Sequence, residues 1–307
     1  MKRLCFLVIC MSIIMGCSTS TSSTKALVDY VDPNIGTAHC RWFCYTPAAI
    51  PFGMAKLAPS TDAHLGNPGG WQAVGYDFRH TSIEGFANFH EFQVGGVVFA
   101  PTVGELQTVP GELENPDGGY RSRFDKKDEV AAPGYYSVLL KDYGVKAELT
   151  AMKRVGFHRY TYPKTEQANL IFDIGNKQGE SGEVKDAEVQ YFEDGRVEGY
   201  VITSPVYVNI YQKGADVRMY FSAVLNKKPV QVGTFVKDVV NPGKHQEKGP
   251  GAGLYMTFST EEQEAVEVKV GLSYTSIENA RFNRETEAAD VTFDQAKKNA
   301  TDVWNES

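Results

Sequence analysis

Cysteine is scarce in this sequence, and most of it lies at the N-terminus. Five cysteines occur among 307 residues, and Cys5, Cys10 and Cys17 lie in or directly after an apolar first segment. Only Cys40 and Cys44 remain, which is too few for a disulfide framework, and no further ligands at a suitable spacing complete a zinc site. The two could form a disulfide, whose five-residue loop would gain little closure entropy, or remain thiols. The sequence leaves both alternatives open.

Basic side chains are in the minority, and no long apolar run follows the first segment. There are 31 Lys and Arg against 38 Asp and Glu, which gives a formal charge of −7 at pH 7. Proteins bind nucleic acid largely by neutralising its phosphates, so this acidic balance argues against a nucleic-acid partner. No later stretch has the about 20 apolar residues that a transmembrane helix needs, so none is predicted.

Residues 1–16 have the pattern of a signal peptide, and residues 17–27 that of a polar tether. Lys2 and Arg3 precede "LCFLVICMSIIM", a run too short to span a bilayer but typical of a secretion signal. Met15-Gly16-Cys17 then resembles a bacterial lipobox, in which cleavage leaves the cysteine as the lipidated first residue.

We therefore expect an exported protein, lipid-anchored through Cys17 in the bacterial cell envelope, in the periplasm or at the outer-membrane surface. Membrane contact would be through this anchor. The alternative is an ordinary signal peptide with an incidental cysteine. Lys2 and Arg3 would leave with the signal, so 29 of the 31 basic residues would face all 38 acidic ones, a formal charge of −9.

Residues 28–289 are predicted to form an antiparallel β-sandwich. From residue 134 onward, short segments of alternating apolar and polar residues are separated by turn signals, as at Asp142-Tyr143-Gly144 and Asp194-Gly195. This spacing is typical of a sandwich. Residues 208–212, "VNIYQ", are read as one of the strands, and residues 241–253 as a flexible loop.

Residues 290–307 change to helical spacing. The apolar residues that recur at this spacing are Phe293, Ala296, Ala300, Val303 and Trp304. Thr292 or Asp290 could cap the start of the helix. An amphipathic helix needs a surface to lie against, so it either docks on the sandwich or leads into a second domain.

Five segments resemble, in their order and spacing, the N-terminal domain of glycoside hydrolase family 92. They are "YVDPNIGT" (30–37), "TPAAIPFGMAKLAPST" (46–61), "GGWQAVGYDF" (69–78), "SIEGFANFHEF" (82–92) and "GYYSVLLKDYGVKAELTAMKRVGFHRYTYP" (134–163). The resemblance covers residues 28–304. It implies a secreted or lipid-anchored bacterial exo-α-mannosidase that requires calcium and inverts the anomeric centre.

The resemblance also implies an architecture. The fold would be an all-β, antiparallel, supersandwich-like β-sandwich whose C-terminal helix leads toward a larger (α/α)6 barrel. In this family the barrel carries the general acid, the general base and the calcium ligands. The expectation is therefore that residues 290–307 are a linker helix, that the catalytic barrel is missing from this chain, and that the chain holds neither catalytic residues nor metal ligands. The partners would be a glycan and, if it is encoded, such a barrel.

The sequence departs from the family pattern in two places. Family members read roughly S-H-T-H-L-S-G where this chain has "ANFHEFQ" (87–93), and they often have further histidines where it has "AHCRWFCY" (38–45). Only His39 and His90 stand in those places. The changes around His90 suggest an altered substrate pocket.

The candidates for substrate binding lie in these aromatic-rich segments. They are Trp71, Tyr76, Asp77, His90, Glu91, Arg41 and His39. Glycines on both sides of Trp71 let a loop present its ring to the apolar face of a sugar, unless the ring fills a gap in the core. His39 and Arg41 could donate hydrogen bonds to sugar hydroxyls, or lie in a surface loop with one salt bridge.

His90 and Glu91 are not a zinc motif, because Val94 stands where H-E-x-x-H requires a histidine. Adjacent residues on a strand point to opposite faces, so at most one of the two faces the substrate, and His90 is preferred. The alternative is a satisfied polar pair at a sheet edge. His158 is expected in the core, and His245 in a solvated loop.

An inverting glycosidase uses two carboxyls about 6.5–9.5 Å apart. Asp77, Glu84 and Glu91 are the acids near the candidate residues, and Glu84 is expected to cap or to pair on a turn. A catalytic pair is not expected among them, because the resemblance places that chemistry in the barrel.

The sequence thus predicts the N-terminal carbohydrate-cleft domain of a family 92-like exo-acting α-mannosidase, acting on glycans such as mannose-containing N-glycans. The chain alone would be inactive. A free-standing carbohydrate-binding surface lipoprotein is the alternative, and a nonfunctional remnant is a third reading.

Overall fold

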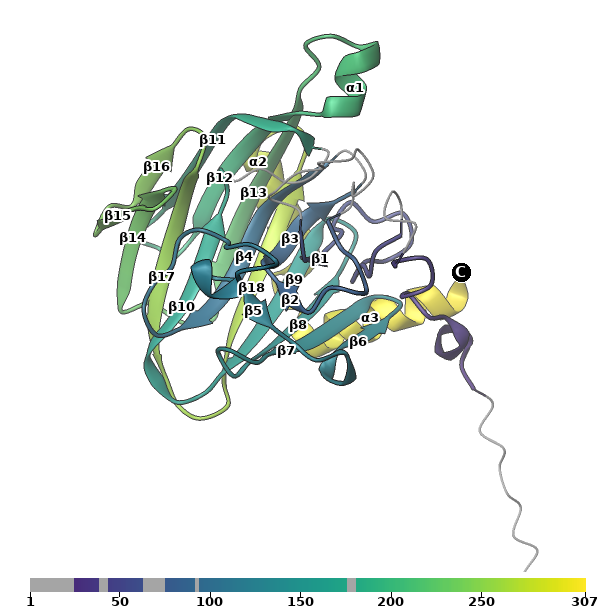
Figure 1. The fold of residues 1–307 in the computed structure, drawn as a ribbon. Coiled ribbons are helices and arrows are strands. Elements are labelled where there is room, and N and C mark those ends of the chain that lie inside the picture. Colours follow the sequence, from purple (N-terminus) through teal and green to yellow (C-terminus); the bar gives the residue numbers. More distant parts are fainter. Residues whose placement is uncertain (1–24, 39–43, 63–74, 92–93, 176–180) are drawn as a thin grey trace, which may run out of the picture.

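Two antiparallel sheets packed face to face form the body of the protein (Figure 1). The computed structural model describes residues 25–38, 44–62, 75–91, 94–175 and 181–307. The predicted β-sandwich with a C-terminal helix is confirmed. Long alternating strands form it because each sheet must bury one apolar face against the other.

The seven-stranded sheet contains, in spatial order, β1 (Ala58–Ser60), β3 (Gly85–His90), β4 (Gly95–Val103), β10 (Thr165–Asp173), β17 (Ala252–Thr260), β14 (Gln231–Val236) and β15 (Val239–Pro242). The nine-stranded sheet contains β16 (Gln246–Lys248), β11 (Glu183–Tyr191), β12 (Val197–Ser204), β13 (Val217–Leu225), β18 (Glu264–Ser273), β9 (Val155–Tyr162), β8 (Val145–Ala151), β7 (Tyr135–Leu140) and β6 (Val130–Ala132). A small separate sheet pairs β2 (Ser82–Ile83) with β5 (Ser122–Arg123).

Aromatic side chains fill the space between the two large sheets. The ring centroids of Phe99 and Phe172, on neighbouring strands of the seven-stranded sheet, lie 4.0 Å apart. Phe172 in turn meets Phe221 of the nine-stranded sheet at 6.3 Å. All three are fully buried, so this stack couples the two sheets through the centre of the core.

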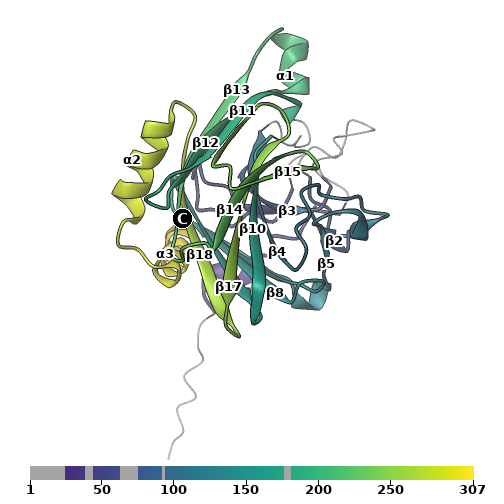
Figure 2. The same cartoon turned by 90° about the vertical axis from the view of Figure 1, so that its left-hand side faces the viewer.

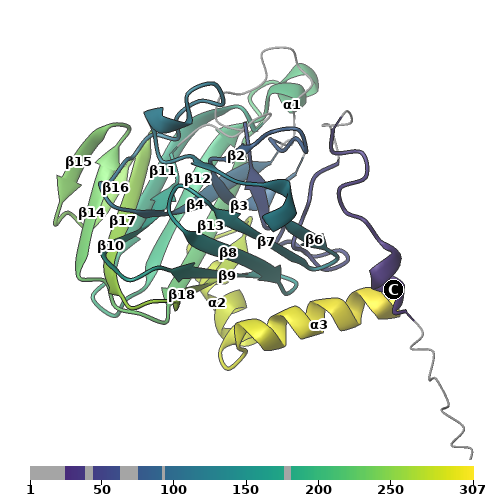
Figure 3. The same ribbon diagram turned by 60° about the horizontal axis from the view of Figure 1, so that its bottom comes forward.

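Two helices cover the outer face of the nine-stranded sheet (Figures 2 and 3). They are α2 (Ile277–Ala288), which packs on β18 and β13, and α3 (Phe293–Glu306), which packs on β7, β8 and β9. Thr292 caps α3 in a capping box with Gln295. The indole Nε1 of Trp304 donates to the carbonyl oxygen of Ala49 at 2.7 Å. The helix α3 therefore docks on the sandwich, and its role as a linker to a second domain stays a prediction.

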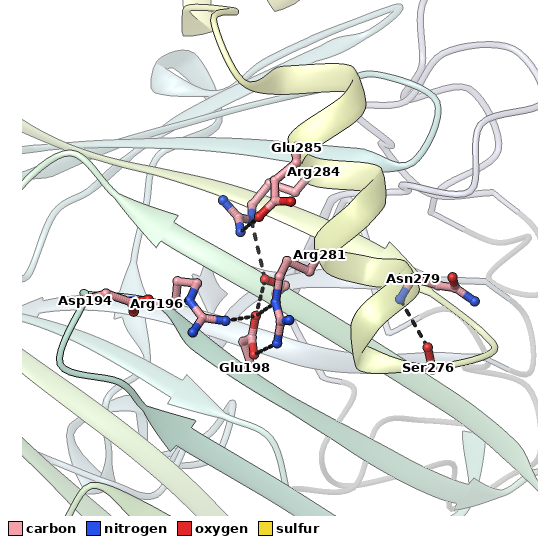
Figure 4. A network of polar contacts seen from close by, with 9 residues as sticks. Asp194, Arg196, Glu198, Ser276, Asn279, Arg281, Arg284 and Glu285 are labelled. Atoms are coloured by element: carbon pink, nitrogen blue, oxygen red, sulfur yellow. Dashed lines mark hydrogen bonds and ion pairs between the residues drawn. The ribbon is translucent and has the colours of Figure 1, made fainter.

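A buried carboxylate fastens α2 to the sheet (Figure 4). Glu198 on β12 is 3% exposed and accepts hydrogen bonds from Arg281 of α2 (Nη2–Oε2 2.6 Å), from Arg196 (Nη1–Oε1 3.0 Å) and from Ser222 (Oγ–Oε1 2.7 Å). Burial alone would raise the pKa of Glu198, but these donors and the arginine charges hold it below its usual value.

Two local predictions are wrong. Residues 208–212 are not a strand: Val206–Tyr211 form the helix α1, which projects from one end of the sandwich (Figure 1). The Asn209 side chain holds this turn, since its Nδ2 donates to the Pro205 oxygen at 2.8 Å and its Oδ1 accepts from the Gly214 amide at 2.9 Å. The predicted loop 241–253 contains the strand β16, which pairs with β11.

Candidate functional site

The segment that carries His90 is the strand β3, whose six residues are all buried. At its C-terminal end the Tyr45 ring packs on the His90 ring, with centroids 4.5 Å apart. The Tyr45 hydroxyl donates to the His90 carbonyl oxygen. Burial lowers the pKa of His90 to about 3, although the Glu84 carboxylate acts in the opposite direction. The His90 Nδ1 has no hydrogen-bond partner among the described residues.

Glu91, the next residue, lies in a different environment. Its side chain is 41% exposed and forms an ion pair with Lys56, which is 31% exposed. Burial and the charge of Glu91 raise the pKa of the nearby Tyr274 to about 12. His90 and Glu91 therefore differ in burial. Glu91 lies one residue beyond the end of β3, whose six residues are all buried, and it takes Lys56 as its partner. Which of them contacts a substrate stays a prediction.

Tyr76 and Asp77 are both fully buried. The Tyr76 hydroxyl donates to Glu129 Oε1 at 2.8 Å and accepts from Lys126 Nζ at 3.1 Å. The Asp77 carboxylate accepts two hydrogen bonds from the Arg79 guanidinium, at 2.9 and 2.7 Å. Burial and the neighbouring Glu129 raise the pKa of Tyr76 far above its usual range. In this arrangement both side chains hold the protein segment together, and their proposed contact with a sugar stays a prediction.

Thr61 links this segment to the first strand of the sheet. Its amide donates to the Gly75 oxygen at 2.7 Å, and its Oγ1 accepts from the Asp77 amide at 3.0 Å. The same Oγ1 lies 2.9 Å from Nδ1 of His80. The residues that follow 74 are thus tied to the end of β1 by one threonine.

Glu84 forms an ion pair inside the molecule. Its Oε2 lies 3.0 Å from Nη2 of Arg121, and both side chains are almost completely buried. The Arg121 Nη1 also donates to the Thr61 oxygen at 2.5 Å. The prediction that Glu84 pairs is confirmed, but the pair lies between β2 and β3 in the interior and not on a turn. No sequence signal pointed to Arg121, because it comes 37 residues later in an unremarkable stretch.

His158 lies in the core, as predicted. Its Nε2 is 2.8 Å from Asn88 Oδ1, and its Nδ1 is 2.8 Å from the Tyr160 hydroxyl. Asn88 Nδ2 donates to the Val97 oxygen at 2.7 Å. Burial lowers the pKa of His158 to about 3. Asn88, which stands where the family pattern has a histidine, therefore serves the core of the sandwich.

Several candidates lie outside the described residues. They are Trp71, His39, Arg41, Cys40 and Cys17, and their proposed roles stay predictions. Within the described ranges, no helix is long and apolar enough to cross a membrane. The same ranges bring together no group of three His, Cys, Asp or Glu that could hold a metal ion.

The three candidate acids Asp77, Glu84 and Glu91 each pair with a basic side chain. Asp77 pairs with Arg79, Glu84 with Arg121 and Glu91 with Lys56. Inverting hydrolysis needs one protonated carboxyl and one carboxylate that activates water. Three carboxylates in ion pairs do not supply that combination, so what this region can offer a ligand is hydrogen bonding and aromatic surface.

Comparison with known proteins gives a consistent result. The sequence model of the glycosyl hydrolase family 92 N-terminal domain matches residues 30–273. No curated protein matches the chain. Among solved structures, the family GH92 alpha-mannosidase BT3965 from Bacteroides thetaiotaomicron is similar, with a TM-score of 0.82 and 29% identity over 92% of this chain and 38% of that one. The same enzyme has been solved with mannoimidazole.

A second similar structure is the GH92 family glycosyl hydrolase ccman5, with a TM-score of 0.74 and 25% identity over 91% of this chain and 36% of that one. The inverting mannosidase BT2199 from Bacteroides thetaiotaomicron shares the fold, with a TM-score of 0.74 at 20% identity over 93% of this chain and 36% of that one. The chain thus spans a little over a third of the length of each of these proteins.

Proposed function

Because the chain belongs to glycoside hydrolase family 92, as its N-terminal domain, we propose that it is the carbohydrate-cleft domain of an exo-acting, α-mannosidase-like enzyme. The substrates would be glycans such as mannose-containing N-glycans. The match over residues 30–273 carries this proposal. The similarity to an alpha-mannosidase at a TM-score of 0.82 supports it.

The cleft wall would lie around the end of β3. Among the described candidates, Glu91 is the residue whose side chain is open to solvent, whereas Tyr76, Asp77 and His90 are buried. We therefore expect Glu91, held in place by Lys56, to be the first described side chain that a sugar meets. Trp71, Arg41 and His39 complete the proposed set.

The acid and base would come from a different domain. Three acids near β3 are engaged in ion pairs, and the described residues bring together no group of three His, Cys, Asp or Glu. We propose that an (α/α)6 barrel supplies both carboxyls and the calcium ligands, as the family resemblance implies. No step of the reaction is assigned to this chain.

An exposed apolar face supports the existence of such a partner. This surface, called the α3 face, consists of Leu27, Tyr30, Ile50, Phe52, Val303 and Trp304. The 3-10 helix η1 (Leu27–Tyr30) contacts α3, and Ile50 and Val303 line one hollow of about 440 Å³ beside it. Phe52 is 100% exposed. Exposed apolar side chains on neighbouring elements are typical of an interaction site.

The decisive test is turnover of aryl α-mannosides and mannobioses by the full chain, with calcium present. We expect no turnover above background, and clear turnover would contradict the assignment of the catalytic carboxyls to another domain. Binding to a mannose-containing N-glycan should weaken in Glu91→Gln. The control Glu278→Gln, at an exposed position of α2, should bind as the wild type does.

The free-standing lipoprotein remains the competing function. It differs from the proposal in what is encoded after residue 307, so the downstream DNA separates the two. A reading frame for a helical barrel there supports the enzyme, and the lack of one nearby would favour a binding protein.

We also propose that the protein is exported and anchored through a lipid on Cys17. The basic start, the short apolar run and Met15-Gly16-Cys17 support this location. Incorporation of radiolabelled palmitate in a bacterial host should disappear in Cys17→Ser and persist in Cys44→Ser. Equal labelling of the two variants would contradict the anchor.

A further inference from the structure

The outer face of the seven-stranded sheet carries a row of polar side chains. Thr102, Asn169, Thr257 and Gln231 stand directly opposite one another on β4, β10, β17 and β14. Thr257 Oγ1 donates to Asn169 Oδ1 at 2.8 Å, and Asn169 Nδ2 donates to the Gly104 oxygen at 3.0 Å. Asn169 is 2% exposed, so this row is held rigidly at its centre.

A hollow of about 530 Å³ is lined by three residues of this row, Asn169, Thr257 and Gln231. Its volume falls within the range of pockets that bind small molecules. Tyr255 forms part of the floor and lies across Gly233, where a Cβ atom would come within 2.4 Å of the Tyr255 hydroxyl. The glycine therefore lets the ring lie flat and directs its hydroxyl toward Gln231, whose Nε2 donates to it at 3.3 Å.

The hollow offers hydrogen-bonding groups that the protein itself does not use. Neither Gln231 Oε1 nor the proton of the Tyr255 hydroxyl has a partner among the described residues. Gln167 is exposed at the rim, where Glu105 and Glu166 add two carboxylates, and the hollow is lined by no Lys or Arg of the described chain. Amides, hydroxyls and carboxylates together can donate to and accept from a row of hydroxyl groups.

The charge of the rim restricts the ligand. Glu105 and Glu166 make the rim negative, although Lys164 lies near Glu166 outside the lining. Phosphate esters and acidic sugars are therefore less favourable ligands than neutral sugars. Val230, which is 68% exposed, adds an apolar surface beside the polar row. A pyranose ring has an apolar C–H face and a hydroxyl rim, and a neutral sugar matches this combination.

The hollow is separate from the proposed cleft. His90 pairs with Gly95 at the start of β4, whereas Thr102 lies seven residues further along the same strand, at roughly 23 Å for an extended chain. The polar row also faces outward, while Phe99 on the same strand points into the core.

We propose that this hollow is a second binding site, which takes a neutral oligosaccharide segment and holds it apart from the cleft. It would bind a branch of a glycan or polysaccharide while another end lies at the cleft. The site does not depend on where the catalytic carboxyls are, so it can hold or fail independently of the proposed function.

Affinity electrophoresis of the full chain tests this site. The wild-type chain should be retarded in at least one of four gels, which contain yeast mannan, xylan, dextran or a β-glucan. It should not be retarded in a gel that contains polygalacturonate. The double variant Gln167→Ala/Gln231→Ala should raise the apparent Kd at least fivefold. Both side chains are exposed, and thermal melting will verify that the variant is folded.

A control variant makes the result decisive. Gln212→Ala, a matched control at the exposed end of α1, should migrate as the wild type does. The proposal is overturned if no neutral polysaccharide retards the chain, or if the double variant is retarded as strongly as the wild type.

Discussion

Two histidines are held neutral inside the sandwich. Burial lowers the pKa of both His90 and His158 to about 3, against about 6.5 in an unfolded chain. Between these values the unfolded chain binds more protons than the folded one. The contribution of these two histidines to the free energy of unfolding is therefore fully present above pH 6.5, and it is lost as the pH falls toward 3.

The first prediction is a loss of stability in mild acid. Between pH 7 and pH 5, each histidine should remove about 2 kcal/mol from the free energy of unfolding. His158→Gln should remove about half of this pH-dependent loss, because one of the two titrating groups is gone. Urea denaturation at the two pH values measures the difference, whatever the absolute stability of the variant.

His245→Gln is the matched control. His245 is exposed, so this variant should show the same difference between pH 7 and pH 5 as the wild type. A wild-type chain that is equally stable at both pH values would contradict the burial of the two histidines.

For single residues, the sequence predicts whether a side chain is buried more easily than it predicts which side chain it pairs with. The position of His158 between apolar neighbours on a strand indicated a core residue, and the structure bears this out. The sequence predicts that Glu84 caps or pairs on a turn, but it does not identify Arg121 as the partner. The packing of β2, β3 and β5 brings the Arg121 guanidinium to Glu84. Pairing between residues 37 positions apart depends on the tertiary fold, which local spacing does not encode.

Among the elements, strands were predictable and two helices were not. The strands predicted over residues 135–162 match β7, β8 and β9 closely. Most residues of these strands are buried on both faces, because α3 covers the face that does not meet the other sheet. The sequence shows no apolar pattern for the helix α2, because its buried residues include Asn283 and Arg284. Hydrogen bonds and ion pairs hold this helix on the sheet in place of an apolar stripe, and the apolar stripe is the feature by which a sequence reveals an amphipathic helix. In α1, the strand-like residues 208–212 are held in a helical turn by Asn209.

The second prediction concerns the polar anchor of α2 (Figure 4). Glu198→Gln would take the carboxylate partner from Arg281, whereas Arg196 would keep its ion pair with Asp194. We expect a loss of about 2 kcal/mol, below the value for a fully buried pair because Arg281 is 35% exposed and solvent screens it. Urea denaturation followed by circular dichroism measures this loss.

Glu278→Gln provides the comparison on the same helix. Glu278 lies on the exposed side of α2, so the substitution should change stability by less than about 0.5 kcal/mol. Similar losses in the two variants would show that Glu198 is not what fastens α2 to the sheet.

On the scale of the whole molecule, the α3 face stands out because its apolar side chains are exposed to solvent. Pro51 and Phe52 occupy the centre of a turn closed by a hydrogen bond from the Gly53 amide to the Ile50 oxygen. The φ angle of Phe52 is +57°, a conformation that turns normally reserve for glycine. The described chain does not cover the Phe52 ring, which is 100% exposed, so packing of this side chain does not offset the strain of its backbone.

The third prediction is that replacing Phe52 by glycine raises the free energy of unfolding and reduces the exposed apolar area of the α3 face. Phe52→Gly loses no internal contact, because the ring is 100% exposed, and removes a left-handed conformation that costs a non-glycine residue about 1–2 kcal/mol. Glycine adds chain entropy to the unfolded state, so we expect a net gain of about 1 kcal/mol in the free energy of unfolding. Binding of a hydrophobic fluorescent dye to the folded chain should fall in the same variant.

Phe282→Ala separates the α3 face from exposed aromatics in general. Phe282 is 60% exposed on α2, where the backbone is helical and unstrained, so its removal should leave both stability and dye binding near the wild-type values. If Phe52→Gly destabilises the chain, the turn is not strained as described. If both variants lose dye binding equally, the α3 face is not a distinct surface. A gain in stability together with a loss of dye binding in Phe52→Gly alone would show that Phe52 costs folding stability and forms the exposed apolar surface of the α3 face.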